Sequence, residues 1–348
     1  MLTRPDDWHL HLRDEPYLAD VVRHSAERFG RAIVMPNLDP PVTTTARALA
    51  YRDRIVACLP RPEAFRPLMT LYLTAETSPA EIRAAKQSGV VHGVKYYPVG
   101  TTTHSHHGVS DPEQVSTALA AMEEVGLPLL VHGESPDAGV DAFDREAVFI
   151  DRTLDPLIRR FSHLRVVLEH LSTARAVDFV AAAPPHVGGT VTAHHLLLNR
   201  SAIFDGGLRP HLYCAPVLKR ESDRRALVGA VTGGNPKFFL GTDSAPHART
   251  AKESSPGRAG VFTAHAAIEL YAECFAAAGA LDRLEAFASL HGAAFYGLPP
   301  NRERLTLVRR SHSIPETLPF GDGELVPFRA GGTVEWSLAR AASQEGAR

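Results

Sequence analysis

The chain has 348 residues, of which 44% are hydrophobic and 22% charged, and its formal net charge is −2. This balance is typical of a soluble globular protein, and it gives no general attraction to nucleic acid or to an anionic membrane surface. No apolar run reaches about 18 residues, so no membrane-spanning helix is predicted. The three cysteines, Cys58, Cys214 and Cys274, are widely spaced and favour a reducing, cytoplasmic compartment over a disulfide framework.

Short apolar runs recur along the chain, and each has the length of a buried strand. The first run ends near residue 8, and the others cover 31–35, 67–73, 90–96, 128–131, 164–168, 187–192 and 238–240. Between them lie amphipathic segments such as 111–125, 144–161 and 221–231, which are predicted helices. The segment at 111–125 begins with Asp111-Pro112-Glu113 and is followed by Gly126, which are typical start and stop signals. Strands that alternate with helices predict parallel βα units.

Such units close either as a doubly wound sheet or as a (β/α)8 barrel. The first predicted strand is not followed by a GxGxxG loop, which disfavours the doubly wound dinucleotide-binding sheet. The sequence therefore predicts an α/β fold, a (β/α)8 TIM-like barrel over about residues 1–300. Short strands at 305–308, 324–328 and 334–337 indicate a small C-terminal extension over about 301–348. We expect residues 1–348 to form a single domain.

Polar side chains stand at the carboxyl ends of the predicted strands. They are His9, His11, Asn37, Lys95, His132, His170 and Asp243. The carboxyl ends of all eight strands of a barrel meet on one face, so these residues are predicted to share a pocket. Any one of these histidines could be an ordinary core or surface residue. As a set, four neutral imidazoles and a carboxylate suit Zn²⁺.

Lys95 needs separate treatment, because an ammonium group would repel a metal ion held by the histidines. One interpretation is a side chain that extends to solvent. The other is carbamylation of Lys95 by CO₂, which turns the cation into an anion whose two oxygens can bridge two metals.

These residues lie in segments with a recognisable pattern. The segments are Asp7-Trp8-His9-Leu10-His11-Leu12-Arg13-Asp14, Met35-Pro36-Asn37-Leu38, Lys95-Tyr96-Tyr97-Pro98, Val131-His132-Gly133-Glu134, Leu168-Glu169-His170, His211-Leu212-Tyr213-Cys214, Gly241-Thr242-Asp243-Ser244-Ala245-Pro246-His247 and Phe295-Tyr296-Gly297-Leu298-Pro299. The pattern resembles the amidohydrolase superfamily and, within it, the bacterial-type homodimeric dihydroorotases. The resemblance covers essentially the whole chain.

The resemblance implies a cytoplasmic homodimer that converts N-carbamoyl-L-aspartate and dihydroorotate, a small-molecule substrate pair of pyrimidine biosynthesis, without nucleic acid or membrane partners. It implies two Zn²⁺ ions per chain. One would be held by His9, His11, carbamylated Lys95 and Asp243, and the other by Lys95, His132 and His170. A bridging hydroxide would attack the ring carbonyl, with Asp243 as general acid and base. The alternative for Asp243 is a helix N-cap.

Further residues would bind the substrate. Arg13 follows His11 by two positions, and its guanidinium can form a bidentate hydrogen bond with a carboxylate. The alternative for Arg13 is a structural ion pair with Asp14 or Asp7. In the resembling family, residues matching Asn37 and His247 also bind the substrate carboxylate, together with backbone groups near Ala215 and Ala259. Hydroxyls matching Thr102 and Thr103 belong to a loop, 100–110, that can act as a lid. The neighbouring His104, His106 and His107 are expected to face solvent.

Three other functions remain open at this point. A hydantoinase-like cyclic-amide hydrolase would share the metal ligands but not the carboxylate-binding set of Arg13, Asn37 and His247. A mononuclear deaminase would not need Lys95. A catalytically silent scaffold would usually have a broken ligand set, whereas here every ligand position is filled.

Overall fold

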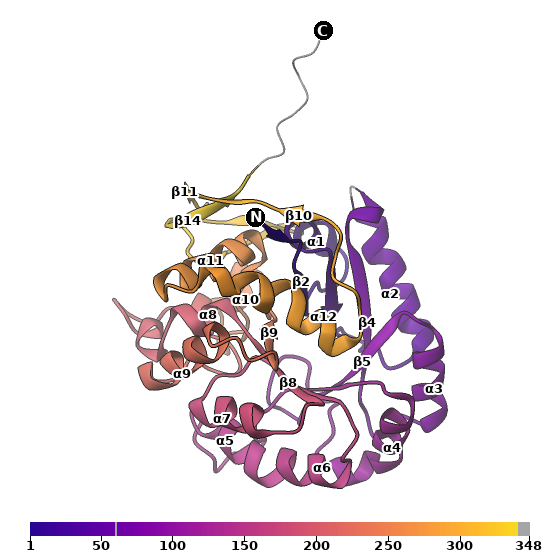
Figure 1. Cartoon of the computed structure of the whole chain (residues 1–348). Coiled ribbons are helices and arrows are strands. Elements are labelled where there is room, and N and C mark those ends of the chain that lie inside the picture. Colours follow the sequence, from indigo (N-terminus) through magenta and orange to yellow (C-terminus); the bar gives the residue numbers. More distant parts are fainter. Residues whose placement is uncertain (60, 340–348) are drawn as a thin grey trace.

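The computed structural model describes residues 1–59 and 61–339. Its centre is a sheet of eight parallel strands in sequence order, from β2 to β9 (Figure 1). The strands are β2 (Asp6–Leu10), β3 (Arg31–Val34), β4 (Arg66–Tyr72), β5 (Val91–Tyr96), β6 (Leu129–Val131), β7 (Val166–Leu168), β8 (Val187–Val191) and β9 (Phe238–Leu240). Each predicted run forms a strand whose ends differ from the prediction by at most two residues. The largest consequence is that His9 lies inside β2 rather than after it.

The first and last strands of the sheet meet, and the sheet closes into a barrel. The closing contacts lie just beyond β9, where Asp243 N donates to His9 O at 2.9 Å and His11 N donates to Ser244 O at 3.1 Å. Leu10 and Ser244 form a parallel bridge at the same place. The (β/α)8 barrel is therefore confirmed over the doubly wound sheet. The residues that close the barrel are also residues of the predicted site.

Helices cover the outside of the barrel (Figure 1). They are α1 (Leu18–Arg28), α2 (Thr45–Ala57), α3 (Pro79–Gln87), α4 (Ser116–Val125), α5 (Arg145–Phe149), α6 (Asp155–Arg160), α7 (Ala174–Ala182), α8 (Ala193–Leu197), α9 (Glu221–Thr232), α10 (Arg249–Lys252), α11 (Ala267–Ala277) and α12 (His291–Tyr296). The predicted start at Asp111 is present, because its side chain accepts from Glu113 N at 3.0 Å. Among the helices described, none has the length and apolarity needed to cross a membrane.

Two of the predicted helices are interrupted. The segment at 111–125 begins as a 3-10 turn, Pro112–Val115, and becomes α4 only at Ser116. The segment at 144–161 is divided into α5, a π-helical turn at Ile150–Leu154, and α6. The predicted helix at 221–231 is present as α9.

The barrel interior is a packed apolar core below the site. Trp8, Leu130 and Phe239 lie in this core, and the Trp8 ring stacks on Tyr296 with centroids 4.5 Å apart. Tyr296 belongs to α12, whose first residue, His291, is 3.1 Å through Nδ1 from the carbonyl of Phe238, the first residue of β9. Helix α12 therefore closes the end of the barrel at which the strands begin. The opposite end, where the strands finish, remains for the site.

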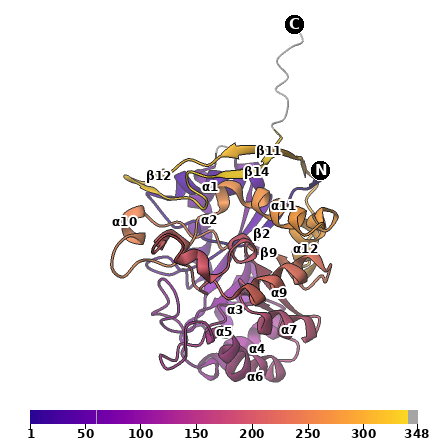
Figure 2. The same cartoon turned by 90° about the vertical axis from the view of Figure 1, so that its left-hand side faces the viewer.

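After α12 the chain forms short antiparallel strand pairs. Strand β10 (Arg304–Leu305) pairs with β1 (Leu2–Thr3), β11 (Leu307–Ser313) with β14 (Thr333–Leu338), and β12 (Leu318–Phe320) with β13 (Gly323–Leu325). Figure 2 shows β11 and β14 at one side of the barrel, next to α1 and α11. Strands are thus present in each predicted C-terminal region, but the segment expected at 305–308 is divided between the end of β10 and the start of β11, and the strand expected at 324–328 ends at Leu325. Residues 340–348 of the predicted extension lie outside the described residues.

Candidate active site

The residues predicted for the site converge at the carboxyl end of the barrel. One pocket is lined by His9, His11, Arg13, Asn37, Tyr97, Thr102, Thr103, His132, His170, Ala215, Asp243, Ala245, Ala259 and Gly260. The set includes every predicted site residue except Lys95 and His247. Lys95 is fully buried on β5, and His247 contacts Arg13 without lining the pocket itself. Seven of the eight strands, or the segments that follow them, contribute to this pocket, and only β4 contributes no lining residue.

One group of potential ligand atoms gathers around Asp243. Its Oδ1 lies 3.3 Å from His9 Nε2 and 3.0 Å from His11 Nε2, and the two imidazole nitrogens are 3.3 Å apart. Burial lowers the pKa of His9 to about 3, and it also lowers the pKa of His11. Both rings are therefore neutral at physiological pH and have the protonation state that metal binding requires.

A second group lies beside the first. His132 Nδ1 and His170 Nε2 are 3.1 Å apart, and the rings of His9 and His170 have centroids 5.1 Å apart. His9, His170 and Asp243 offer ligand atoms that all lie within 4.8 Å of one another. Burial holds the pKa of His170 well below its ordinary value. The two groups together form one continuous cluster of nitrogen and oxygen donors.

Three of the four histidines of the cluster are oriented by contacts on their other ring nitrogens, whereas His170 Nδ1 has no partner among the described residues. His9 Nδ1 contacts Glu169 Oε2, His11 Nδ1 is 2.9 Å from Asn37 Oδ1, and His132 Nε2 is 2.9 Å from Glu134 Oε2. An imidazole that donates one N–H to an oxygen presents the lone pair of its other nitrogen to the cluster. Glu134 and Glu169 had no predicted role. The signal was their position, since each stands within two residues of a predicted ligand.

Lys95 is the one cationic side chain predicted among the metal ligands, where an ammonium group would repel a metal ion. It has no exposed surface, and Nζ has no hydrogen-bond partner among the residues that the structure describes. Burial lowers the pKa of Lys95 to about 7, although Asp243 acts in the opposite direction. The side chain does not extend to solvent. A buried amine near neutrality can react with CO₂, and the resulting carbamate would add two oxygens to the donor cluster. The residues present therefore fit a binuclear zinc centre.

Arg13 is held by fixed contacts at the edge of the pocket. Its Nε donates to Pro246 O at 2.9 Å, and its Nη2 lies 2.9 Å from His247 Nε2. His247 Nε2 is also 2.9 Å from Ala259 O. These contacts connect three of the predicted substrate-binding residues, Arg13, His247 and Ala259, around one partly buried guanidinium.

The alternative ion pairs for Arg13 are absent from the described contacts. Asp14 pairs with Arg54 instead, at 2.7 Å. Asp7 is fully buried and accepts from Thr242 Oγ1 at 2.6 Å. Both acids therefore have structural partners of their own.

Three site residues adopt backbone conformations in the left-handed region. Their φ angles are 61° at Arg13, 41° at His170 and 43° at Asp243. Such conformations cost about 1–3 kcal/mol for a residue other than glycine and persist where the surrounding structure fixes them. Asp243 is not a helix N-cap, because the next helix, α10, starts only at Arg249. The strain instead turns these side chains toward the pocket immediately after their strands end.

The loop at 100–110 lies over the pocket and is anchored through its main chain. Asn37 Nδ2 donates to Thr103 O at 3.2 Å, and Tyr72 OH donates to His104 O at 3.0 Å. His106 and His107 are exposed, as expected. His104 differs from the expectation: it is half-buried, and its Nδ1 lies 3.2 Å from Asn37 O. Its backbone sits in the left-handed region, which turns the ring inward.

Three pocket residues had no predicted role: Tyr97, Ala245 and Gly260. Tyr97 is buried, and its hydroxyl has no partner among the described residues. Its position two residues after Lys95 was a usable signal, because alternate residues point to the same side of a strand. Ala245 and Gly260 carry no chemical signal in the sequence.

Comparison with known proteins agrees with this geometry. Residues 7–306 match the model of the Amidohydrolase family. The chain is 61% identical over 337 residues to a dihydroorotase of Methylobacillus flagellatus, covering 97% of this chain and 98% of that protein. Its structure is similar to crystal structures of dihydroorotase from Campylobacter jejuni (34% identity) and from Saccharomyces cerevisiae in complex with 5-fluoroorotic acid (32% identity). Each has a TM-score of 0.89 and covers 97% of both chains.

An L-hydantoinase from Arthrobacter aurescens is a more distant neighbour. Its TM-score is 0.78 at 17% identity, covering 97% of this chain and 83% of that one, so the likeness concerns the fold alone. The chain belongs to the amidohydrolase family and, within it, groups with the dihydroorotases.

Proposed function

We propose that this protein is a dihydroorotase, which catalyses the reversible hydrolysis of dihydroorotate to N-carbamoyl-L-aspartate in pyrimidine biosynthesis. The observation that carries the proposal is the meeting, in one pocket, of a histidine–aspartate cluster with the fixed guanidinium of Arg13. The cluster suits cleavage of an amide, and the guanidinium suits a substrate with a carboxylate that does not react. The relatives described above carry the same name.

The cluster would hold two Zn²⁺ ions. His9, His11, carbamylated Lys95 and Asp243 would hold one, and Lys95, His132 and His170 would hold the other. Neutral imidazoles and carboxylate oxygens are the donors that zinc takes in catalytic sites. When bound, the metals would polarise the ring carbonyl and lower the pKa of the attacking water.

Asp243 would move the proton. In hydrolysis a new C–O bond forms at the ring carbonyl and the ring C–N bond breaks. The Asp243 carboxylate accepts the proton of the attacking water and delivers it to the departing nitrogen. In ring closure the same carboxylate removes a proton from the carbamoyl nitrogen. Its Oδ1 lies beside the Nε2 atoms of His9 and His11, at 3.3 and 3.0 Å, so the carboxylate stands within the cluster of ligand atoms.

Arg13 would bind the substrate carboxylate, with Asn37, His247 and the backbone of Ala215 and Ala259 around it. The contacts of Arg13 with Pro246 O and His247 fix the guanidinium before the substrate arrives, which lowers the entropy lost on binding. Thr102 and Thr103 would add hydroxyl contacts from the loop above. This carboxylate-binding set separates the proposal from a hydantoinase-like activity, which would use the metal ligands without it.

The quaternary structure and compartment are part of the proposal. The resemblance to the homodimeric class supports a dimer, and light scattering after gel filtration would measure the mass directly. The three cysteines are free thiols, which suits a reducing, cytoplasmic compartment.

The decisive experiment is hydrolysis of dihydroorotate by the purified protein, followed by loss of ring absorbance. Metal content is determined on the same sample. We expect turnover from protein that carries at least about two metals per chain, as a binuclear centre requires. A folded, metal-replete sample that leaves dihydroorotate intact but hydrolyses a hydantoin would overturn the substrate assignment.

The proton-transfer role has its own test. The Asp243→Asn variant should bind dihydroorotate and lose turnover by at least about 100-fold, because general acid–base catalysis contributes about 10²–10⁴-fold. Metal content must be measured as well, because Asp243 is also a proposed ligand. Turnover near that of the wild type would contradict the role.

A further inference from the structure

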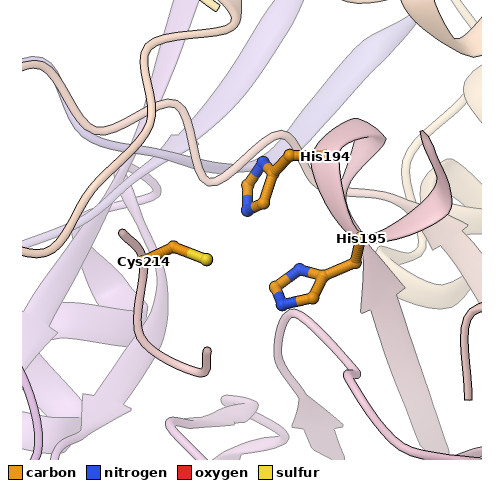
Figure 3. A group of neighbouring side chains, drawn as sticks. All are labelled: His194, His195 and Cys214. Carbon is orange, nitrogen blue, oxygen red and sulfur yellow. The ribbon is translucent and has the colours of Figure 1, made fainter. Parts of the chain in front are cut away.

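A second cluster of potential metal ligands lies outside the residues discussed so far. It consists of His194 and His195, at the start of α8, and Cys214, in the segment before Ala215 (Figure 3). The three side chains are buried, with exposures of 1%, 2% and 1%. Each offers a ligand atom, and these atoms all lie within 4.8 Å of one another. Figure 3 shows the two imidazole rings and the sulfur directed at a common space.

His194 is the member whose burial lacks an explanation. Both ring nitrogens are buried, and neither has a hydrogen-bond partner in the part of the chain that the structure describes. Burying a polar group without a partner costs about 1–3 kcal/mol. His195 is different, because its Nε2 donates to Pro216 O at 3.1 Å and its Nδ1 lies 2.7 Å from Thr192 Oγ1. The unpartnered ring of His194 therefore indicates a bound ligand, such as a metal ion, that would accept the lone pair of a ring nitrogen.

Cys214 supplies a sulfur donor on the other side of that space. Its thiol donates to Pro216 O at 3.2 Å. Burial raises the pKa of Cys214 to about 12, so the free thiol is neutral at physiological pH. A transition metal ion that binds to a thiol displaces its proton, and the resulting thiolate offsets one of the ion's positive charges. Two imidazoles and one thiolate form a donor set that selects zinc-like ions over Mg²⁺ or Ca²⁺.

We propose that His194, His195 and Cys214 form an additional metal site that takes Zn²⁺ or another thiophilic divalent transition metal ion. The site is separate from the cluster around Asp243 and shares no ligand with it. Zinc bonds of about 2.0–2.1 Å to nitrogen and 2.3 Å to sulfur require the ligand atoms to move closer together, by roughly 1 Å at the widest pair. His195 must give up one of its two hydrogen bonds to bind. Cys214 likewise gives up its hydrogen bond to Pro216 O when the thiol proton is displaced, whereas His194 has no such bond to lose among the described residues.

Occupation of this site would stiffen one wall of the active-site pocket. Cys214 directly precedes Ala215, which lines the pocket. The preceding residue, Tyr213, accepts through its carbonyl from Gly260 N at 2.9 Å, and Gly260 lines the pocket as well. An ion that ties Cys214 to α8 would fix both segments. Metal binding should therefore raise the thermal unfolding midpoint of the wild type more than that of a variant without the thiol.

Cobalt substitution tests the proposal directly, because only this site offers sulfur. Wild-type protein titrated with Co²⁺ should develop a thiolate-to-cobalt charge-transfer band in the near ultraviolet. The cluster around Asp243 has only nitrogen and oxygen donors and gives visible d–d bands alone. We expect the Cys214→Ser variant to lose the charge-transfer band together with about one Co²⁺ per chain, the equivalent that one such site holds.

Two further variants control the experiment. Cys274→Ser removes another buried free thiol, on α11, and should keep the full band. His194→Ala should weaken Co²⁺ binding at this site by at least about tenfold, since it removes a ligand without touching the sulfur. Circular dichroism establishes that each variant is folded. If Cys214→Ser does not fold, the comparison of His194→Ala with the wild type decides the question.

Two results would overturn the proposal. One is wild-type protein that shows the d–d bands but no charge-transfer band in excess Co²⁺. The other is a charge-transfer band that survives in Cys214→Ser. The readout does not depend on catalysis, so a charge-transfer band in protein without dihydroorotase activity would retain this site while overturning the proposed function.

Discussion

At the scale of single residues, burial determines the chemistry that each side chain can perform. His9 and Lys95 are both lowered in pKa by burial, to about 3 and about 7. Burial disfavours the charged form of each group, so the imidazole has the neutral form that metal binding requires and the amine is closer to the neutral form that reaction with CO₂ would require. Glu134 and Glu169 then determine which nitrogen of each ring faces the cluster. These protonation states and ring orientations each depend on burial or on one or two side-chain contacts, so substitution can test them.

The contact between Glu134 and His132 should control metal affinity. Glu134→Ala removes the acceptor for the His132 N–H and should weaken metal binding by about 10–100-fold. The metal affinity of Glu134→Gln, which keeps an acceptor without the charge, should lie between that of the wild type and that of Glu134→Ala. Zinc retained after dialysis against a graded series of chelators measures the effect. Glu124→Gln, in an exposed pair with Arg83, is the matched control, and an equal loss in that variant would contradict the role of Glu134.

Arg13 should control substrate affinity. Arg13→Lys keeps the charge but loses the planar donor pair, so the contacts to Pro246 and to the substrate carboxylate cannot form together. Hydrogen bonds to charged groups contribute about 1.5–3 kcal/mol, so KM should rise by roughly 10-fold or more. Steady-state kinetics measure this value. Arg83→Lys, at an exposed position, should leave KM unchanged, and an unchanged KM for Arg13→Lys would contradict the assignment.

At the scale of elements, the ends of the strands and the loops after them carry the site. Arg13, His170 and Asp243 leave their strands in the left-handed region, which turns each side chain toward the pocket. The loop at 100–110 is fixed from below by Asn37 and Tyr72 through main-chain carbonyls. The barrel therefore supplies the positions of the cluster residues, and the anchored loop brings the hydroxyls of Thr102 and Thr103 to the pocket.

The hydroxyls of the loop can be removed without breaking its anchors. Those anchors use the carbonyls of Thr103 and His104, so the double variant Thr102→Ala/Thr103→Ala isolates the side chains. A lid that contacts the substrate during reaction predicts a lower kcat as well as a higher KM. Ser110→Ala, exposed in the same loop, is the control. A rise in KM alone would reduce the role of the hydroxyls to binding.

The buried carboxyl group of Glu146, on α5, should make the stability of the protein depend on pH. Burial raises its pKa to about 7, although it accepts from Ser172 N at 2.9 Å and contacts Thr173 Oγ1. An acid whose pKa is raised by folding stabilises the protein fully below its unfolded pKa, about 4.5. This contribution is lost as the pH rises through about 7.

The Glu146→Gln variant removes the titration while keeping the side-chain shape. The free energy of unfolding of the wild type should fall relative to the variant between about pH 4.5 and pH 7 and then level off. Urea unfolding at pH 5 and at pH 8 measures the difference. An equal difference at both pH values would show that Glu146 does not titrate in this range.

At the scale of the whole molecule, contacts between distant segments close the barrel. Asp243 N and His9 O join the last strand to the first across more than two hundred residues of chain. Outside the barrel, Arg28 on α1 donates to both carboxylate oxygens of Glu269 on α11, at 2.9 and 2.8 Å. Both partners of this pair are buried. Helix α12 completes the structure by closing the end opposite the site.

Removal of one partner of this buried pair should destabilise the protein strongly. Glu269→Ala leaves the guanidinium of Arg28 buried without its main partner, which costs about 3–5 kcal/mol. Glu27→Ala is a matched control, because Glu27 contacts the same guanidinium at 3.1 Å from an exposed position. This control should lose no more than about 1 kcal/mol. Urea unfolding of both variants provides the comparison, and similar losses in the two would contradict the prediction.

The positions of the strands could be predicted well from the sequence, because buried parallel strands read as short apolar runs. The convergence of His9, His11, His132 and His170 followed from barrel geometry and from the resemblance. The orienting role of Glu169 toward His9 and the inward position of His104 could not be predicted, because each depends on a contact between residues from different segments. Glu134 contacts His132 two residues away, so its position beside a predicted ligand was a local signal, although only the structure shows the contact.

The sequence by itself determined the barrel, the order of its strands and the residue types at the carboxyl ends. These follow from local periodicity and from the rule that parallel strands finish on one face. Only the tertiary structure decided that Arg13 is fixed by Pro246 and His247, that Lys95 Nζ is buried without a hydrogen-bond partner among the described residues, and that His194, His195 and Cys214 meet. Each of these results depends on packing between segments far apart in the chain, where burial and close contact determine the charge and orientation of a side chain.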